Sequence, residues 1–251
     1  MNSFKSQLTV WFACLLSIAS FQVQAEEWEF RIAALLEYGK SGDRLGINGA
    51  RAKVGVGALI PQLAVENDWF GELSIGYGYG VEPNWGAELG PVKAKGDLDS
   101  EVFRAAYRRA FSISDRWDLE LFAEHRDYEL EGTPEGTFNT TTVPIDVDSK
   151  VKLDEAGLML VWRQSDALAF TAGVSYLDWS VDSTAFLQTP DGRISASIEL
   201  EGDNTTPQYH LGLRFEVMEH PFALEFRHAD LEAEKSTSIP ALRISTDLYH
   251  F

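Results

Sequence analysis

The sequence has only one cysteine, Cys14, and it lies in an apolar segment near the N-terminus. Without a second cysteine the chain has no disulfide framework, and beyond Cys14 it has no thiolate chemistry. Basic residues are also scarce: 21 Lys and Arg stand against 39 Asp and Glu, which gives a formal net charge of −18. Nucleic-acid binding needs clustered basic side chains that neutralise phosphates, so this composition argues against nucleic acid as a partner.

The N-terminal segment has the three-part layout of a secretory signal. Lys5 is followed by an apolar stretch over about residues 8–21, and then by VQA, a small-residue pattern that predicts cleavage after Ala25. The sequence therefore predicts a signal peptide over residues 1–25 and a mature chain over residues 26–251. The mature chain contains no long apolar run, so no membrane-spanning helix is expected.

A period-two alternation of apolar and polar residues recurs through the mature chain, and this is the pattern of half-buried β-strands. The alternating segments lie at 28–38, 51–60, 71–79, 103–111, 117–125, 155–162, 168–176, 209–217, 222–228 and from 242 onward. The connections after the even-numbered segments are short, and those after the odd-numbered segments are mostly long. This alternation is typical of outer-membrane barrels, which have short periplasmic turns and long extracellular loops.

We therefore predict an all-β fold, a transmembrane antiparallel up-and-down β-barrel of about ten strands, with roughly 8 to 12 compatible with the pattern. Residues 183–200 contain TPDG between two alternating runs, which predicts a hairpin extension of the flanking strands; an extra strand pair is the alternative. A soluble periplasmic β-protein would alternate too. Aromatic residues at strand ends and glycines on the polar faces favour the membrane barrel, because they suit interfacial girdles and a narrow interior.

The last predicted strand ends in an aromatic motif, LYHF. Tyr249 is out of phase with the apolar face that ends at Leu248, and a bulge near Leu248 would return Tyr249 and Phe251 to the lipid face. An alternating last strand with Tyr two residues before a final Phe resembles the C-terminal signal of Gram-negative outer-membrane β-barrel proteins. Asp247 departs from that pattern, which usually has an apolar residue there.

The resemblance implies that the protein is located in the cell outer membrane. It also implies partners: the barrel-assembly machinery, which would read Tyr249 and Phe251, and outer-membrane lipid and lipopolysaccharide. The chain is expected to act as a monomer.

Charged side chains on the polar faces of adjacent predicted strands should meet inside the barrel. The candidates for this lumen salt-bridge network are Arg104, Arg108, Glu120, Glu124, Arg214, Glu216, Glu225 and Arg227. We expect the first four to pair with one another, and the last four likewise. Side chains fill barrels of this size, whereas wide aqueous channels need about sixteen strands. The prediction is a largely filled polar lumen, with a narrow pore as an alternative to a closed barrel.

Carboxylates at the outer ends of three predicted strands form a further candidate site. They are Asp127, Asp178 and Asp230, accompanied by Glu129, Glu131, Glu232 and Glu234. Oxygen ligands of this kind suit Ca²⁺ or Mg²⁺, so a ring of them could hold a cation or bridge one to lipopolysaccharide phosphates. The alternative is that these carboxylates only face water at the level of the lipid headgroups. No other cofactor is expected.

The segment GDLDS puts Asp97 and Asp99 at the top of the fourth predicted strand. There they resemble the aspartate pair of omptin-type surface proteases. These proteases are ten-stranded barrels in which the aspartate pair faces an Asp–His pair across the top of the barrel. The resemblance implies a hydrolase site with His228 and Asp230, although their order is reversed and the facing loop, 182–206, has no histidine.

None of the five histidines is followed two residues later by Ser, as in lipid-deacylating barrels. A nucleophile needs a base within hydrogen-bond reach, and no such pair is visible in the sequence. The main prediction is a non-enzymatic outer-membrane protein with acidic surface loops that acts structurally, by loop-mediated binding, or as a narrow pore. A surface hydrolase and a soluble periplasmic β-protein are the alternatives.

Overall fold

A computed structural model describes residues 28–40, 45–47, 50–53, 55–89, 92–138, 141–188, 195–218, 220–231 and 237–250. Nearly all of these residues are in β-strands. The predicted signal peptide lies outside the described residues, as do Glu232, Glu234 and Phe251. No helix in the described ranges is long and apolar enough to cross a membrane.

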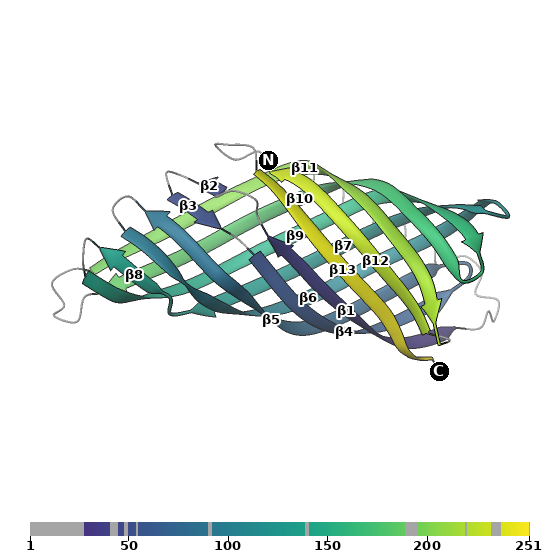
Figure 1. The fold of residues 1–251 in the computed structure, drawn as a ribbon, viewed down its shortest axis with the longest axis horizontal. Helices are drawn as coiled ribbons and strands as arrows, with labels where there is room; N and C mark the ends of the chain where they lie inside the picture. Colours follow the sequence, from purple (N-terminus) through teal and green to yellow (C-terminus); the bar gives the residue numbers. More distant parts are fainter. Residues whose placement is uncertain are drawn as a thin grey trace.

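Ten antiparallel strands close into a ring, as the alternation predicts, and they run obliquely around it (Figure 1). In ring order they are β1 (Glu29–Lys40), β4 (Gly55–Asn67), β5 (Gly71–Leu89), β6 (Val92–Ser114), β7 (Trp117–Gly132), β9 (Thr141–Ser165), β10 (Leu168–Gln188), β11 (Ser195–Val217), β12 (His220–Leu231) and β13 (Thr237–His250). Because β1 pairs with both β4 and β13, the ring is closed. The other described strands, β2 (Leu45–Ile47), β3 (Ala50–Lys53) and β8 (Glu135–Phe138), are short pieces near the long connections.

Most of the residues predicted to form long loops are strand instead. β5 and β6 stay paired out to Leu89 and Val92, and β7 and β9 also continue far beyond their predicted ends. β10 and β11 are paired without interruption out to Gln188 and Ser195, which confirms the predicted hairpin extension and excludes the extra strand pair. The predicted segments were too short because polar residues on the outer face of these extensions break the apolar alternation expected of a lipid-facing strand.

Strand β4 differs from the second alternating segment, 51–60, in which Ala58 and Ile60 belong to the apolar phase that is expected to face lipid. Ala58 and Ile60 point inward and are 1% and 0% exposed, whereas Leu59 and Leu63 point outward and are 56% and 68% exposed. The strand also continues to Asn67, through residues predicted to be a turn. The segment GALIPQLAVEN is apolar in both phases, so alternation could not decide which phase faces lipid.

The outer face of the ring carries a belt of exposed apolar side chains. The belt includes Leu36, Leu59, Leu63, Ile75, Leu121, Leu158, Leu160, Val174, Leu211, Leu224 and Ile244. Exposed aromatic side chains flank it, among them Trp28, Phe30, Phe111, Trp117 and Phe170 toward the short turns, and Tyr38, Tyr77, Tyr79, Tyr176 and Tyr209 toward the long hairpins. A belt of this extent is unusual for a surface in water, and it fits the lipid-facing band of a membrane barrel with its aromatic girdles.

The interior is divided into zones along the barrel. Toward the long hairpins it is an apolar core, formed by Leu35, Ala58, Ile60, Ala94, Leu98, Val102, Tyr128, Leu130, Val143, Ile145 and Val147. The charged side chains described below fill the middle, and a cavity opens toward the short turns. The prediction of a polar lumen is therefore wrong for the hairpin half. There the outer face is polar, so the hairpins bury their apolar face inside the barrel.

The last strand contains the predicted bulge. Consecutive residues of β1 pair with Asp247 and with Tyr249, so Leu248 is the extra residue of β13. The bulge leaves Tyr249 on the outer face, where it is 57% exposed, as predicted. Asp247 lies on the inner face, where it accepts a hydrogen bond of 2.8 Å from Arg31 of β1. Asp247, which precedes the terminal motif, therefore links the two strands that close the ring.

Gly78 of β5 leaves no room for a side chain. A Cβ atom there would lie 2.2 Å from the carbonyl oxygen of Leu59 and 2.7 Å from the Cα of Ile60, both in the backbone of β4. We expect Gly78→Val to lower the folded fraction, because such overpacking costs about 1–3 kcal/mol and here it pushes two paired strands apart. Gel mobility with and without heating measures the folded fraction. Ile75→Val, on the outer face of the same strand, is the control, and equal folding of both variants would contradict the clash.

Candidate functional site

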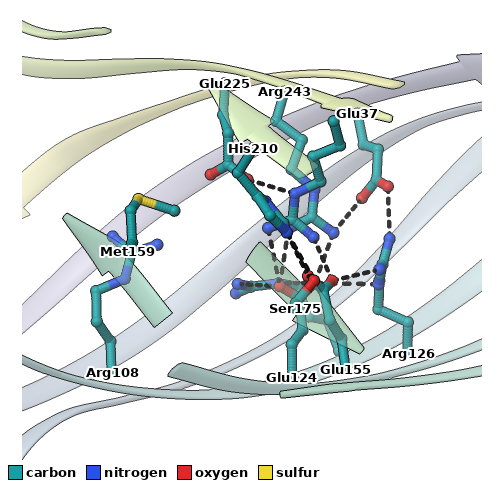
Figure 2. A network of polar contacts seen from close by, with 12 residues as sticks. Glu37, Arg108, Glu124, Arg126, Glu155, Met159, Ser175, His210, Glu225 and Arg243 are labelled. Atoms are coloured by element: carbon teal, nitrogen blue, oxygen red, sulfur yellow. Dashed lines mark hydrogen bonds and ion pairs between the residues drawn. The ribbon is translucent and has the colours of Figure 1, made fainter. Parts of the chain in front are cut away.

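Glu124 of β7 is the centre of a buried ion-pair network (Figure 2). Its carboxylate lies 3.0 Å from Arg104, 3.1 Å from Arg126, 3.5 Å from Arg227 and 2.6 Å from Arg243. These arginines come from β6, β7, β12 and β13, so one carboxylate connects strands from opposite sides of the ring. The side chain of Glu124 is 3% exposed, which means that these charges compensate one another with little help from water.

Two more carboxylates extend the network. Glu37 of β1 lies 2.7 Å from Arg126 and 2.9 Å from Arg243, and Glu155 of β9 lies 3.1 Å from Arg126 and 2.6 Å from Arg227. These two carboxylates and their three arginine partners are all buried. Each of these five charges has at least two partners of opposite sign. Removal of one carboxylate therefore weakens the compensation of several arginines at once.

Ser175 and His210 give this network the outline of a catalytic site. Ser175 Oγ lies 2.7 Å from His210 Nε2, and His210 Nδ1 lies 2.9 Å from Glu225 Oε1, which resembles a Ser–His–acid arrangement. However, Ser175 donates its proton to Glu155 Oε1 at 2.7 Å, and the same oxygen lies 3.0 Å from His210 Nε2. The hydroxyl of Ser175 is therefore directed at a carboxylate, and both imidazole nitrogens of His210 also lie within 3.0 Å of carboxylates, which differs from a nucleophile held by its base alone. His210 is also 1% exposed, beyond the reach of a substrate.

The structure places seven of the eight predicted lumen residues in interior ion pairs. The pairs are Arg104–Glu124, Arg108–Glu120, Arg214–Glu120 and Arg227–Glu225. Arg214 differs from the expectation because it reaches Glu120 of β7, at 2.6 Å, instead of a residue of the adjacent β12. Glu216 is exposed near the short turns and makes no ion pair with any described residue.

Sequence reasoning missed five members of the network: Glu37, Arg126, Glu155, His210 and Arg243. Their strand phase was a usable signal, since each lies on the inward face of its strand together with other polar residues. Several of their contacts cross the lumen, and alternation along a strand gives no pairing between strands that are not neighbours. Glu37 and Arg126, for example, belong to strands that are not neighbours in the ring.

A cavity of about 480 Å³ occupies the interior at the short-turn end. Arg108, Arg163 and Arg214, from β6, β9 and β11, line one side of it. Glu66 and Glu72, from β4 and β5, line another side. The cavity is therefore bounded by charged groups of both signs, and the ion-pair network forms its floor.

The candidate cation ring is not assembled in the described part of the chain. Asp127 and Asp178 point outward from β7 and β10, which are separated by β9 in the ring. Asp127 is level with Lys152 of β9, and the side chain of Asp230 lies outside the described residues. Among the residues that are described, no group of three acidic or histidine side chains is placed to hold a metal ion.

The omptin-like candidates do not face one another either. Asp97 and Asp99 belong to the outward phase of β6, and Leu98 between them points inward and is 1% exposed. His228 is in the outward phase of β12, between two buried residues. β6 and β12 lie on opposite sides of the ring, so the whole barrel separates Asp97 and Asp99 from His228. The predicted hydrolase site is wrong for these residues; the side chain of Asp230 lies outside the described part.

Comparison with known proteins gives a result for the fold alone. No family model matches the sequence, and no curated protein matches it. Among solved structures, the outer membrane protease OmpT from Escherichia coli matches with a TM-score of 0.52 at 12% identity, over 92% of this chain and 99% of that one. The attachment invasion locus protein Ail of Yersinia pestis matches with a TM-score of 0.39 at 10% identity, over 90% of this chain and 99% of that one.

A further match is the translocator domain of the autotransporter NalP from Neisseria meningitidis, with a TM-score of 0.44 at 12% identity, over 99% of this chain and 98% of that one. Identities this low carry no information on activity. Together with the closed ring and the apolar belt, the likeness to OmpT shows that this chain has the fold of an outer-membrane β-barrel.

Proposed function

We propose that this protein is a non-enzymatic outer-membrane barrel with a closed lumen, which acts at the cell surface through the outer face of its long hairpins. The observation that carries the proposal is the buried network around Glu124, which joins strands from opposite sides of the ring. A solute that crossed the barrel would have to separate these ion pairs and expose several buried charges.

A second barrier lies in series with the first. Toward the hairpins the interior is packed with apolar side chains, and Ile60, Leu98, Val102 and Val143 are at most 1% exposed. An ion that passed the network would then enter a region of packed apolar side chains, which is costly for a charged group. The two barriers together favour a closed barrel over the narrow pore.

The outer face of the hairpins supports a role in binding. Acidic residues in its outward phase include Asp97, Asp99, Glu101, Asp127, Glu129, Glu131, Asp146, Asp148 and Asp154. Lys93 and Lys95 of β6 and Lys150 and Lys152 of β9 are the basic residues of the same outward phase on the hairpin part of these strands. A surface with this charge attracts cations, so we propose that it meets lipopolysaccharide through the Ca²⁺ or Mg²⁺ that bridges to lipid phosphates.

Assembly and location are part of the proposal. We propose that the chain is exported by a cleaved signal peptide, that the barrel-assembly machinery reads Tyr249 and Phe251, and that the barrel is monomeric in the outer membrane. The outward position of Tyr249 next to the seam between β1 and β13 supports this role, because it lies where the ring closes.

Liposome swelling tests the closed lumen. Vesicles that contain the folded wild-type protein are expected to swell in arabinose no faster than protein-free vesicles, because the network and the apolar core fill the interior. Vesicles with a general porin are the positive control. Swelling of the wild-type vesicles at a rate that depends on the size of the sugar would show a pore and contradict the proposal.

A further inference from the structure

One wall of the cavity at the short-turn end exposes arginine side chains and buries the carboxylates that pair with them. Arg163 and Arg214 have side chains that are 45% and 29% exposed, and they cover Asp118 and Glu120, which are each 6% exposed. Arg108, 35% exposed, lies beside them. A molecule in the cavity therefore meets guanidinium groups on this side, with the compensating carboxylates behind them.

On the wall formed by β1, β4 and β5, which adjoins Arg108 of β6, the order of the charges is reversed. Arg31 of β1 is 14% exposed and binds Glu66 at 2.7 Å, Glu72 at 2.6 Å and Asp247 at 2.8 Å. Glu66 and Glu72 are 43% and 28% exposed, so they lie in front of the arginine that compensates them. One positive charge also faces three carboxylates here. This wall thus presents negative charge to the cavity.

Arg108 has hydrogen-bonding capacity that the described part of the chain leaves unused. Its nearest carboxylate is that of Glu120, at 3.7 Å, and both oxygens of Glu120 are taken by Arg214, at 2.5 and 2.6 Å. Figure 2 shows Arg108 beside Met159, away from the residues joined by the network, and both line the cavity. The planar guanidinium can bind a carboxylate through two parallel hydrogen bonds.

We propose that this cavity binds a small dipolar molecule, with the chemistry of a short zwitterionic peptide. The ligand carboxylate would bind Arg108, supported by Arg163 and Arg214, and the ligand ammonium would bind Glu66 and Glu72. A cavity of about 480 Å³ suits a ligand of this size. This inference does not depend on the closed lumen, since the cavity lies on the short-turn side of the network.

A simple anion is a poorer fit than a dipolar molecule. Glu72 is directly opposite Arg108 in the pairing of β5 with β6, and Glu120 and Glu225 also line the cavity. An anion bound at Arg108 would therefore be repelled by nearby carboxylates. A ligand that carries its own ammonium group turns part of that repulsion into attraction.

The test uses the folded full-length barrel in a non-ionic detergent and trialanine as the probe, with binding measured by calorimetry. N-acetyl-trialanine, which lacks the ammonium, and trialanine amide, which lacks the carboxylate, are the matched ligands. Loss of one charged hydrogen bond should weaken binding about tenfold or more, so both blocked ligands are expected to bind at least that much more weakly than trialanine. Equal binding of trialanine and either blocked form, or no binding of trialanine at millimolar concentration, would overturn the proposal.

Two variants then assign the ends of the ligand. Arg108→Gln is expected to weaken trialanine about tenfold and to leave the weak binding of trialanine amide unchanged. Glu66→Gln should weaken trialanine and leave N-acetyl-trialanine unchanged. Glu129→Gln, on the outer face, is the control and should bind as the wild type does; gel mobility with and without heating verifies that each variant is folded. Binding that neither cavity substitution changes would show that the peptide lies elsewhere.

Discussion

Replacing Glu124 with alanine is expected to lower the free energy of unfolding by about 3–5 kcal/mol, the usual cost of removing one partner from a buried ion pair. Glu124 lies within 3.5 Å of four arginines on β6, β7, β12 and β13. Glu37 and Glu155 are already shared with other partners, so they do not replace it. The variant leaves at least one uncompensated positive charge among buried side chains. Urea unfolding in lipid vesicles, followed by tryptophan fluorescence, measures the change.

Glu129→Ala is the matched control on the same strand. Glu129 forms an ion pair of 2.8 Å with Lys150, but both side chains are about half exposed, at 51% and 53%. An exposed pair contributes about 0–1 kcal/mol, so this variant should unfold almost as the wild type does. Similar losses for Glu124→Ala and Glu129→Ala would contradict the assignment of Glu124 as the centre of a buried network.

Leu63→Arg is expected to lower the free energy of unfolding by about 2–4 kcal/mol, as arginine does on the lipid face near the middle of a bilayer. Leu63 is 68% exposed on the outer face, with Ile32 of β1 and Ile75 of β5 beside it in the sheet. A side chain so exposed would lose little in water, so the predicted cost comes from lipid around the belt. Unfolding of the variant from phospholipid vesicles measures it.

Thr184→Arg makes the same kind of change on the outer face of the long hairpins. Thr184 is exposed on β10 and is level with Asp148 of β9. This part of the barrel is expected to stand in water, so the variant should change stability by less than about 0.5 kcal/mol. If Leu63→Arg cost as little as Thr184→Arg, the belt around Leu63 would not be lipid-facing.

Alternation predicted the ring because the lipid-facing part of a strand must be apolar on one face. β5 and β10 show how well this works, since the residues from Leu73 to Tyr79 and from Leu168 to Tyr176 point as expected. The rule failed on β4, where both phases are apolar, and on the hairpins, where no lipid constrains the outer face. The bulge at Leu248 was predictable because Asp247 and Tyr249 need opposite environments two residues apart.

The charged interior was only partly predictable, for a geometric reason. Strand phase shows which side chains point inward, and neighbouring strands with short connections give local pairs such as Arg104 with Glu124. Phase does not give distances across the lumen. The contact of Arg214 with Glu120 depends on how the strands tilt and on where the ring closes, and the walls of the short-turn cavity depend on the same geometry.

Ion conductance across a planar lipid bilayer tests the closed lumen most directly. The folded wild-type barrel is expected to give no discrete current steps in potassium chloride, because the network around Glu124 and the apolar core toward the hairpins block the path in series. The protein is added to the bilayer from lipid vesicles, and protease protection of the barrel in these vesicles verifies that it is inserted and folded. Reproducible single-channel steps from the wild-type protein would show a continuous aqueous path and contradict the account.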